Sequence, residues 1–265
     1  MKNIISATIG TLEHIGNFTL INLAKLGKIS IFIARSIKHC FLPPFYPRLI
    51  FIQLLRIGYF SLPVIGLTAI FSGAVLALQS YSGFSRFNAE STIATVVVLS
   101  ITRELGPVLA GLMVAGRVGA SMAAEIGTMR VTEQIDALKT LSINPFKYLI
   151  APRIIAAVIS LPILVIIADI IGIMGGYLVS VHSLGFSPGP YINNTIKFLE
   201  IIDVVSGLVK ASFFGFIIAA MGCYFGYNSN RGAEGVGIAT TNAVVASSIS
   251  ILLLNYIITG WFFGY

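Results

Sequence analysis

Apolar residues gather in five long runs along this chain, each close to the length that crosses a membrane. The hydrocarbon core of a bilayer is about 30 Å thick and an α-helix rises about 1.5 Å per residue, so a span needs roughly 20 apolar residues. The five runs are Ile57–Leu78, Ile93–Gly116, Ile154–Val181, about Val204–Tyr227, and Ile238–Tyr265. They lack the alternation of barrel strands, and backbone groups left unpaired in hydrocarbon cost several kcal/mol each. The pattern therefore predicts an all-α integral membrane protein with five transmembrane helices.

The segment before the first run has apolar residues on one helical face and basic residues on the other. The apolar positions are Leu26, Ile29, Ile33 and Ile37, and the basic positions are Lys25, Lys28, Arg35 and Lys38. This pattern is typical of an amphipathic helix that lies in the membrane interface, and a poorly ordered basic tail is the alternative. Three prolines then end the helix: Pro43, Pro44 and Pro47. We therefore divide the chain into residues 1–48, an interfacial helix and elbow, and residues 49–265, a five-helix domain.

A charged, strongly patterned block, Glu125–Arg153, lies between the second and third runs. Its spacing predicts a short helix over about residues 131–143, with Thr132 as the N-cap and Asn144-Pro145 as the end. A helix this short is marginal in water on its own. It therefore needs a surface to pack against.

The two faces of this short helix differ in polarity. The apolar face carries Val131, Ile135, Leu138 and either Leu141 or Ser142, and the polar face carries Glu133, Asp136, Lys139 and Thr140. The two acids lie near the positive end of the helix dipole and the lysine lies toward the negative end. Binding in a partner's groove and packing on the chain itself require the same periodicity, so both alternatives stay open on physical grounds.

Composition and charge distribution agree with membrane insertion and set a topology. The chain has 265 residues, of which 56% are hydrophobic and 10% charged, and its mean hydropathy is +0.92, whereas a soluble domain carries about 25% charged residues. The net charge is +7. With the N-terminus inside, residues 1–56 contribute seven Lys and Arg, residues 117–153 five, and Arg231 one, against Arg86 and Lys197 outside. The positive-inside rule therefore predicts a cytoplasmic N-terminus and a cytoplasmic charged block, and the positive charge does not indicate a nucleic-acid partner.

Four charged residues fall inside the predicted spans: Arg103, Glu104, Asp169 and Lys210. Each would cost about 2.5–3.5 kcal/mol at the bilayer centre, so they should face protein or water. Arg103 and Glu104 point about 100° apart on their helix and need partners elsewhere. Glu104 and Lys210 lie at similar depth in the outer halves of their spans, which predicts an interhelical pair. Two interpretations stay open: Arg103, Glu104 and Lys210 line a lipid headgroup pocket in which Arg103 and Lys210 meet a phosphate, or these charges form a structural ion pair.

Small residues at four-residue spacing occur in the third and fourth runs, as Gly172 with Gly176 and Gly222 with Gly226. Such spacing lets helix backbones approach closely. We expect these glycines to serve packing within the chain, and Asp169, close to Gly172, to pack against a small-residue surface of this kind.

The remaining reactive side chains do not suggest an enzyme. The histidines, His14, His39 and His182, are scattered, and Cys40 and Cys223 are isolated. Neither a nucleophile with a base nor metal-ligand spacing occurs. The P-loop motif G-x-x-x-x-G-K-[S/T] is also missing, because Gly27-Lys28 is followed by Ile29 where the motif needs Ser or Thr. We therefore expect no catalytic site, no metal and no cofactor in this chain.

Two stretches resemble a known family. R-E-L-G-P-V-L-A-G-L-M-V-A-G-R-V-G-A begins at Arg103, and E-I-G-T-M-R-V-T-E-Q-I-D-A-L begins at Glu125, followed by Asn144-Pro145 and by Ala-Pro-Arg at 151–153. With the five-span layout, they resemble the MlaE family of ABC-transporter permeases, the membrane subunits of lipid transporters that work with MCE-domain proteins. Residues 1–40 carry no comparable motif.

The resemblance implies a phospholipid permease subunit in the inner membrane, and five spans that start from a cytoplasmic N-terminus place the C-terminus in the periplasm. Its partners would be a periplasmic MCE-domain protein, a second copy of itself, and a cytoplasmic ABC ATPase that binds the ATP. The helix over 131–143 would be the coupling helix seated in that ATPase, through Thr132, Glu133, Ile135, Asp136, Leu138 and Lys139. The alternatives are an ion-coupled secondary carrier with Asp169, Glu104 and Lys210 as its relay, and a membrane scaffold that transports nothing.

Overall fold

The computed structural model of the chain describes residues 2–87, 89 and 92–264, and of these it gives no side-chain detail for residues 2–15, 18 and 22. The described residues form helices and connecting turns, without any strand. Five helical stretches are long and apolar enough to cross a membrane: Pro47–Phe87, Ile93–Val131, Phe146–His182, Ile201–Tyr227 and Ala233–Phe263. The prediction of an all-α membrane protein with five spanning segments is confirmed.

Three of the five stretches contain more than one helical element. The first consists of α2 (Pro47–Ile57), η1 (Tyr59–Ser61), α3 (Leu62–Phe84) and η2 (Ser85–Phe87). The second consists of α4 (Ile93–Ser100), η4 (Ile101–Leu105), α5 (Gly106–Val114), η5 (Ala115–Gly119) and α6 (Ala120–Val131). The third consists of η6 (Phe146–Ile150) and α8 (Ala151–His182). The fourth and fifth are α10 (Ile201–Tyr227) and α11 (Ala233–Phe263). Most of these helices extend beyond the predicted runs, because backbone hydrogen bonding continues into polar flanking residues.

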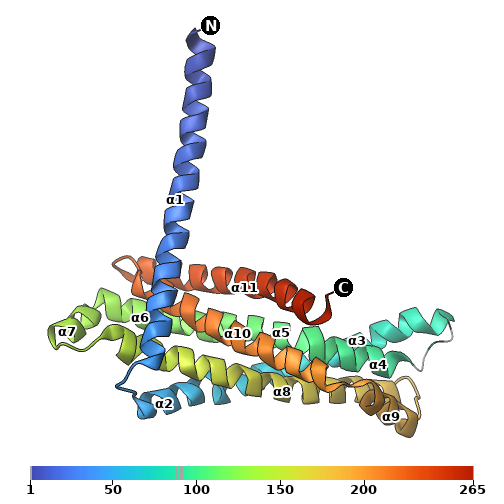
Figure 1. Cartoon of the computed structure of the whole chain (residues 1–265). Helices are drawn as coiled ribbons and strands as arrows, with labels where there is room; N and C mark the ends of the chain where they lie inside the picture. Colours follow the sequence, from blue (N-terminus) through green and yellow to red (C-terminus); the bar gives the residue numbers. More distant parts are fainter. Residues whose placement is uncertain (1, 88, 90–91, 265) are drawn as a thin grey trace.

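The five spans lie side by side, with α7 (Gln134–Thr140) at one end of the bundle and α9 (Pro188–Phe198) at the other (Figure 1). Helix α8 packs against both α3 and α10, and α10 also packs against α6 and α11. The first and fifth spans are the least buried of the five. Their apolar outer faces are therefore available to lipid or to another protein.

Glycines allow the closest helix contacts in the bundle. A Cβ on Gly73 of α3 would overlap the backbone carbonyl of Gly172 in α8. On α10, a Cβ on Gly222 would lie 3.0 Å from the Gly119 carbonyl oxygen, and one on Gly226 would lie 2.8 Å from the Ala123 carbonyl oxygen. The predicted use of these small residues for packing within the chain is confirmed.

Helix α1 (Lys2–Phe41) crosses the direction of the spans and projects away from the bundle (Figure 1). Close to its C-terminal end it packs against η6, α8 and α10. Phe32 is the buried contact, and its ring centroid lies 5.3–6.1 Å from those of Phe146, Tyr224 and Tyr227. Leu26 and Ile37 of the predicted apolar stripe stay exposed. The helix thus contacts its own bundle through the face that carries Phe32 and leaves Leu26 and Ile37 uncovered. Its axis crosses the direction of the spans, as the axis of a helix in the membrane interface would (Figure 1).

Candidate functional site

Arg103 and Glu104 lie in η4, a π-helical turn in the second span. A π turn places one extra residue in the helix and changes the direction in which side chains leave it, and such turns are frequent at functional sites. Both side chains are about one-third exposed, at 34% for Arg103 and 38% for Glu104. Their partners come from α10 and α11.

Glu104 accepts hydrogen bonds from three side chains. Lys210 Nζ donates to Glu104 Oε1 at 2.8 Å, and it also donates to the Arg103 carbonyl at 2.7 Å. Asn255 Nδ2 donates to Oε2 at 2.7 Å, and Thr259 Oγ1 donates to Oε1 at 2.8 Å. The predicted Glu104–Lys210 pair is therefore confirmed. Because the Lys210 side chain is fully buried, its charge depends on Glu104 for neutralisation.

Arg103 has a different set of contacts. Its Nε donates to Asp203 Oδ1 at 2.7 Å, and its Cζ lies 4.4 Å from the centre of the Phe263 ring. The Asp203 carboxylate is fully buried and its Oδ2 also accepts the Glu200 backbone N–H at 3.0 Å, so it is fixed at the start of α10. Within the described residues, Arg103 donates side-chain hydrogen bonds through Nε alone. Both Nη nitrogens therefore remain available to an anion.

The sequence prediction missed Asp203, Asn255 and Thr259. Asp203 stands one residue before the predicted start of the fourth span, so it was not counted among the membrane charges. Asn255 and Thr259 are four residues apart in the more apolar second half of the fifth run, which places them on one helical face. Polar side chains at this spacing inside a span often link helices, so this pattern could have indicated that Asn255 and Thr259 contact another span.

The bonded residues Arg103, Glu104, Asp203, Lys210, Asn255 and Thr259 form the η4 cluster. Asp169 is not part of it. It is 7% exposed, its Oδ1 has no hydrogen-bond partner among the described residues, and it packs directly against Gly106 at the start of α5. The predicted packing against a small-residue surface is confirmed, although the nearest small residue is Gly106 and not Gly172.

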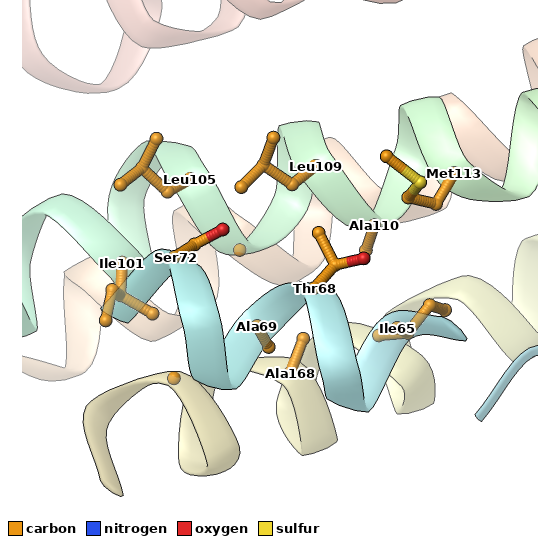
Figure 2. Close-up of a pocket in the computed structure, with 12 residues that line it drawn as sticks. Ile65, Thr68, Ala69, Ser72, Ile101, Leu105, Leu109, Ala110, Met113 and Ala168 are labelled. Carbon is orange, nitrogen blue, oxygen red and sulfur yellow. The ribbon is translucent and has the colours of Figure 1, made fainter. Parts of the chain in front are cut away.

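A small apolar hollow lies between α3, α5 and α8, next to η4. Figure 2 shows Thr68 and Ser72 of α3 pointing toward Leu105 and Leu109. Its volume is about 20 Å³, which is room for little more than one water molecule. This hollow is far too small for a phospholipid acyl chain.

The charged block differs from the prediction in where its helix begins. Thr132 is not an N-cap; it follows the last residue of α6, and its Oγ1 donates back to the Thr128 carbonyl at 2.9 Å. The reason is that the second span continues as helix through Val131, so Thr132 makes the i−4 bond of a helix end. Glu133, with φ of 59°, turns the chain before α7 begins at Gln134. The helix is therefore shorter than the predicted 131–143.

The apolar face of α7 packs on the chain itself. Ile135 is fully buried and Leu138 is half-buried against the core of the bundle. On the other face, Asp136 bonds Lys139 Nζ at 2.9 Å and Arg130 Nη1 at 3.0 Å. The hydrogen bond from Lys139, with Arg130 nearby, holds the pKa of Asp136 below its ordinary value. Self-packing thus accounts for the apolar face, and the charged face is open to a partner.

Both the η4 cluster and α7 lie within a segment that a known family covers. The family model described as Permease MlaE matches residues 50–261. The chain belongs to the MlaE permease family. The resemblance seen between Arg103 and Arg153 is therefore confirmed.

Named relatives agree with this membership. A probable ABC transporter permease protein of Rickettsia bellii is 64% identical to this MlaE-family chain over 251 residues, which are 95% of the chain and 97% of that protein. The intermembrane phospholipid transport system permease protein MlaE of Haemophilus influenzae is 39% identical, over 80% of the chain and 82% of that protein. The chain is thus an ABC-transporter permease and a multi-pass membrane protein.

Proposed function

We propose that the chain is the membrane subunit of an ATP-driven transporter that exchanges phospholipid between the inner membrane and a periplasmic MCE-domain protein. The observation that carries the proposal is Arg103, a partly exposed arginine held inside the spans of an MlaE-family permease. The name of the Haemophilus relative, which refers to phospholipid transport, supports the choice of substrate. The distribution of Lys and Arg supports a cytoplasmic N-terminus and a periplasmic C-terminus.

Arg103 is the proposed contact for the lipid phosphate. Asp203 and Phe263 fix the guanidinium through Nε and the ring face, and its two Nη nitrogens can bind phosphate oxygens in parallel. Lys210 has a different role in this account, because it is buried and already bonded to Glu104. The Glu104–Lys210 pair holds η4 against α10 and α11 and so positions Arg103.

The charged face of α7 is the proposed contact for the ATPase. It offers Asp136 and Lys139, with the exposed Glu133 directly before the helix and the exposed Leu141 directly after it. ATP would be bound and hydrolysed on that separate subunit, so this chain needs no cofactor of its own. Helix α6 leads directly from α7 back through η5 and α5 to η4. Movement imposed at α7 would therefore reach the η4 cluster along one continuous span.

A second copy of the chain would complete the lipid site. The hollow beside η4 holds only about 20 Å³, and the first and fifth spans leave apolar faces exposed. Pairing these faces by two-fold symmetry would enclose a larger apolar space and present two α7 helices to a two-site ATPase.

The test is lipid transfer by the reconstituted complex in proteoliposomes, with fluorescent phospholipid and an MCE-domain acceptor. We expect transfer that requires ATP and persists after an ionophore collapses the proton gradient. Transfer that stops with the ionophore while ATP remains would indicate an ion-coupled carrier. Absence of transfer from a complex that still hydrolyses ATP would indicate a scaffold.

A further inference from the structure

A polar pocket, separate from the apolar hollow beside η4, lies at the α7 end of the spans. It has a volume of about 230 Å³ and is lined by Gln53, Arg56, Phe60, Arg117, Ser121 and Glu125, among others. These residues come from α2 and η1 on one side and from η5 and α6 on the other. Neither Arg103 nor any residue of α7 lines this pocket.

Arg117 lies in η5, the second π turn of the same span, and is exposed. Its Nη1 donates to Ser61 Oγ at 2.7 Å. Ser61 is 1% exposed and is fixed in turn, because its hydroxyl donates to the Ile57 carbonyl at 2.6 Å. One edge of the guanidinium is thus anchored to the protein, while the side chain remains accessible from the pocket.

The neighbouring acid does not neutralise Arg117. Glu125 Oε1 bonds Arg56 Nη1 at 3.0 Å, and Oε2 bonds Arg153 Nη2 at 2.8 Å, so each carboxylate oxygen already has an arginine. Among the described residues, Arg117 has no carboxylate within ion-pair distance. Arg153 is buried and is not part of the lining, so the charged lining residues are Arg56, Arg117 and Glu125, which carry one positive charge in excess.

The two arginines that line the pocket lie at the ends of apolar runs. Arg56 comes directly before the apolar run that begins at Ile57, and Arg117 comes directly after the run that ends at Gly116. Both arginines therefore mark the same boundary of the apolar belt. Arg103 lies fourteen residues away on the same span, which corresponds to about 21 Å of helix.

We propose that this pocket binds the phosphate of an anionic phospholipid from the leaflet on the α7 side, as a site distinct from Arg103. An accessible arginine without a carboxylate partner binds phosphate well, and basic pockets between spans are suited to anionic headgroups. Phe60, 56% exposed and part of the lining, provides an apolar surface for the lipid beside the charged groups. Naming that leaflet as the cytoplasmic one rests on the proposed orientation.

The test measures binding of short-chain phosphatidylglycerol to the purified complex in detergent by native mass spectrometry. The complex carries Arg103→Ala, so the proposed transport site does not contribute. Arg117→Gln should weaken phosphatidylglycerol binding about tenfold or more, as expected for a lost charge-assisted hydrogen bond. Arg117→Lys should recover part of the affinity. The matched control is Arg86→Gln, an exposed arginine at the opposite end of the first span, which should leave binding unchanged.

A second variant and a second ligand test the site independently of Arg117. Ser121→Asp adds a negative charge at an exposed pocket position and should weaken binding even if Arg117→Gln fails to fold. Inorganic phosphate is the second probe. Equal affinity for inorganic phosphate would assign the pocket to a free anion and overturn the lipid source. Unchanged phosphatidylglycerol binding in both the Arg117→Gln and Ser121→Asp variants would overturn the site itself, whether or not the complex transports lipid.

Discussion

At the scale of single residues, Arg103 and Lys210, which the sequence analysis treated together as phosphate contacts, have different environments in the η4 cluster. Lys210 is buried and bonded to Glu104, whereas Arg103 is about one-third exposed and bonded to Asp203. Counting depth along the spans was enough to predict the Glu104–Lys210 pair. It was not enough to find Asp203, because Asp203 lies one residue before the predicted start of the fourth span and therefore outside the charges compared by depth.

The Glu104–Lys210 pair predicts strong non-additivity between substitutions. Glu104→Gln would leave a buried ammonium without its counter-charge, which should cost about 3–5 kcal/mol of stability. Adding Lys210→Met removes that charge and should restore much of the loss. The measurement is unfolding of the purified complex in detergent as a double-mutant cycle. Purely additive losses would show that the two groups do not depend on each other.

At the scale of elements, two contacts decide how the helices are placed: glycine packing between spans and the apolar face of α7. The periodicity of the block correctly predicted that Ile135 and Leu138 face inward, whereas Leu141, also assigned to the apolar face, is exposed. It placed the N-terminus of the helix wrongly, because Thr132 has the composition of an N-cap and only the length of the preceding helix shows that it ends α6. The periodicity could not decide whether the apolar face of the helix packs on the chain itself or docks on a partner, since both arrangements bury the same residues.

The α3–α8 contact predicts opposite effects for two glycines of α3. Gly73→Ala should destabilise the protein by about 1–3 kcal/mol, because the new methyl would overlap the Gly172 carbonyl. Gly83→Ala, where nothing lies within 4 Å of an added Cβ, should be neutral or stabilising by up to about 1 kcal/mol. Thermal unfolding in detergent distinguishes the two. Equal effects would contradict close packing at Gly73.

The two faces of α7 predict separable defects. Ile135→Ala should lower the free energy of local opening of α7 by about 2–5 kcal/mol, because Ile135 is fully buried. Hydrogen exchange of the permease alone measures this. Glu133→Lys with Leu141→Glu alters only exposed positions, so it should leave that exchange unchanged and reduce copurification of the ATPase. A double variant that retains the ATPase and transports lipid normally would exclude α7 as the coupling contact.

At the scale of the whole molecule, the five spans were predictable because hydrophobic length alone determines them. Contacts between them were not, since they depend on which faces meet. Helix α1 shows the difference: its amphipathic pattern is evident in the sequence, but its buried residues, Phe32 and Ser36, are not among the predicted stripe. Helix α7 lies at one end of the spans (Figure 1), directly after the helical stretch Ile93–Val131 that contains η4. This continuity is the physical basis for coupling one to the other.

The central claim is that Arg103 receives the phospholipid headgroup, and ATP-dependent lipid transfer in proteoliposomes tests it most directly. Arg103→Ala should reduce transfer about tenfold or more, while the complex still assembles and hydrolyses ATP. Arg86→Ala, which removes an exposed arginine of the first span, should transfer lipid at the wild-type rate. Wild-type transfer by the Arg103→Ala complex would contradict the account.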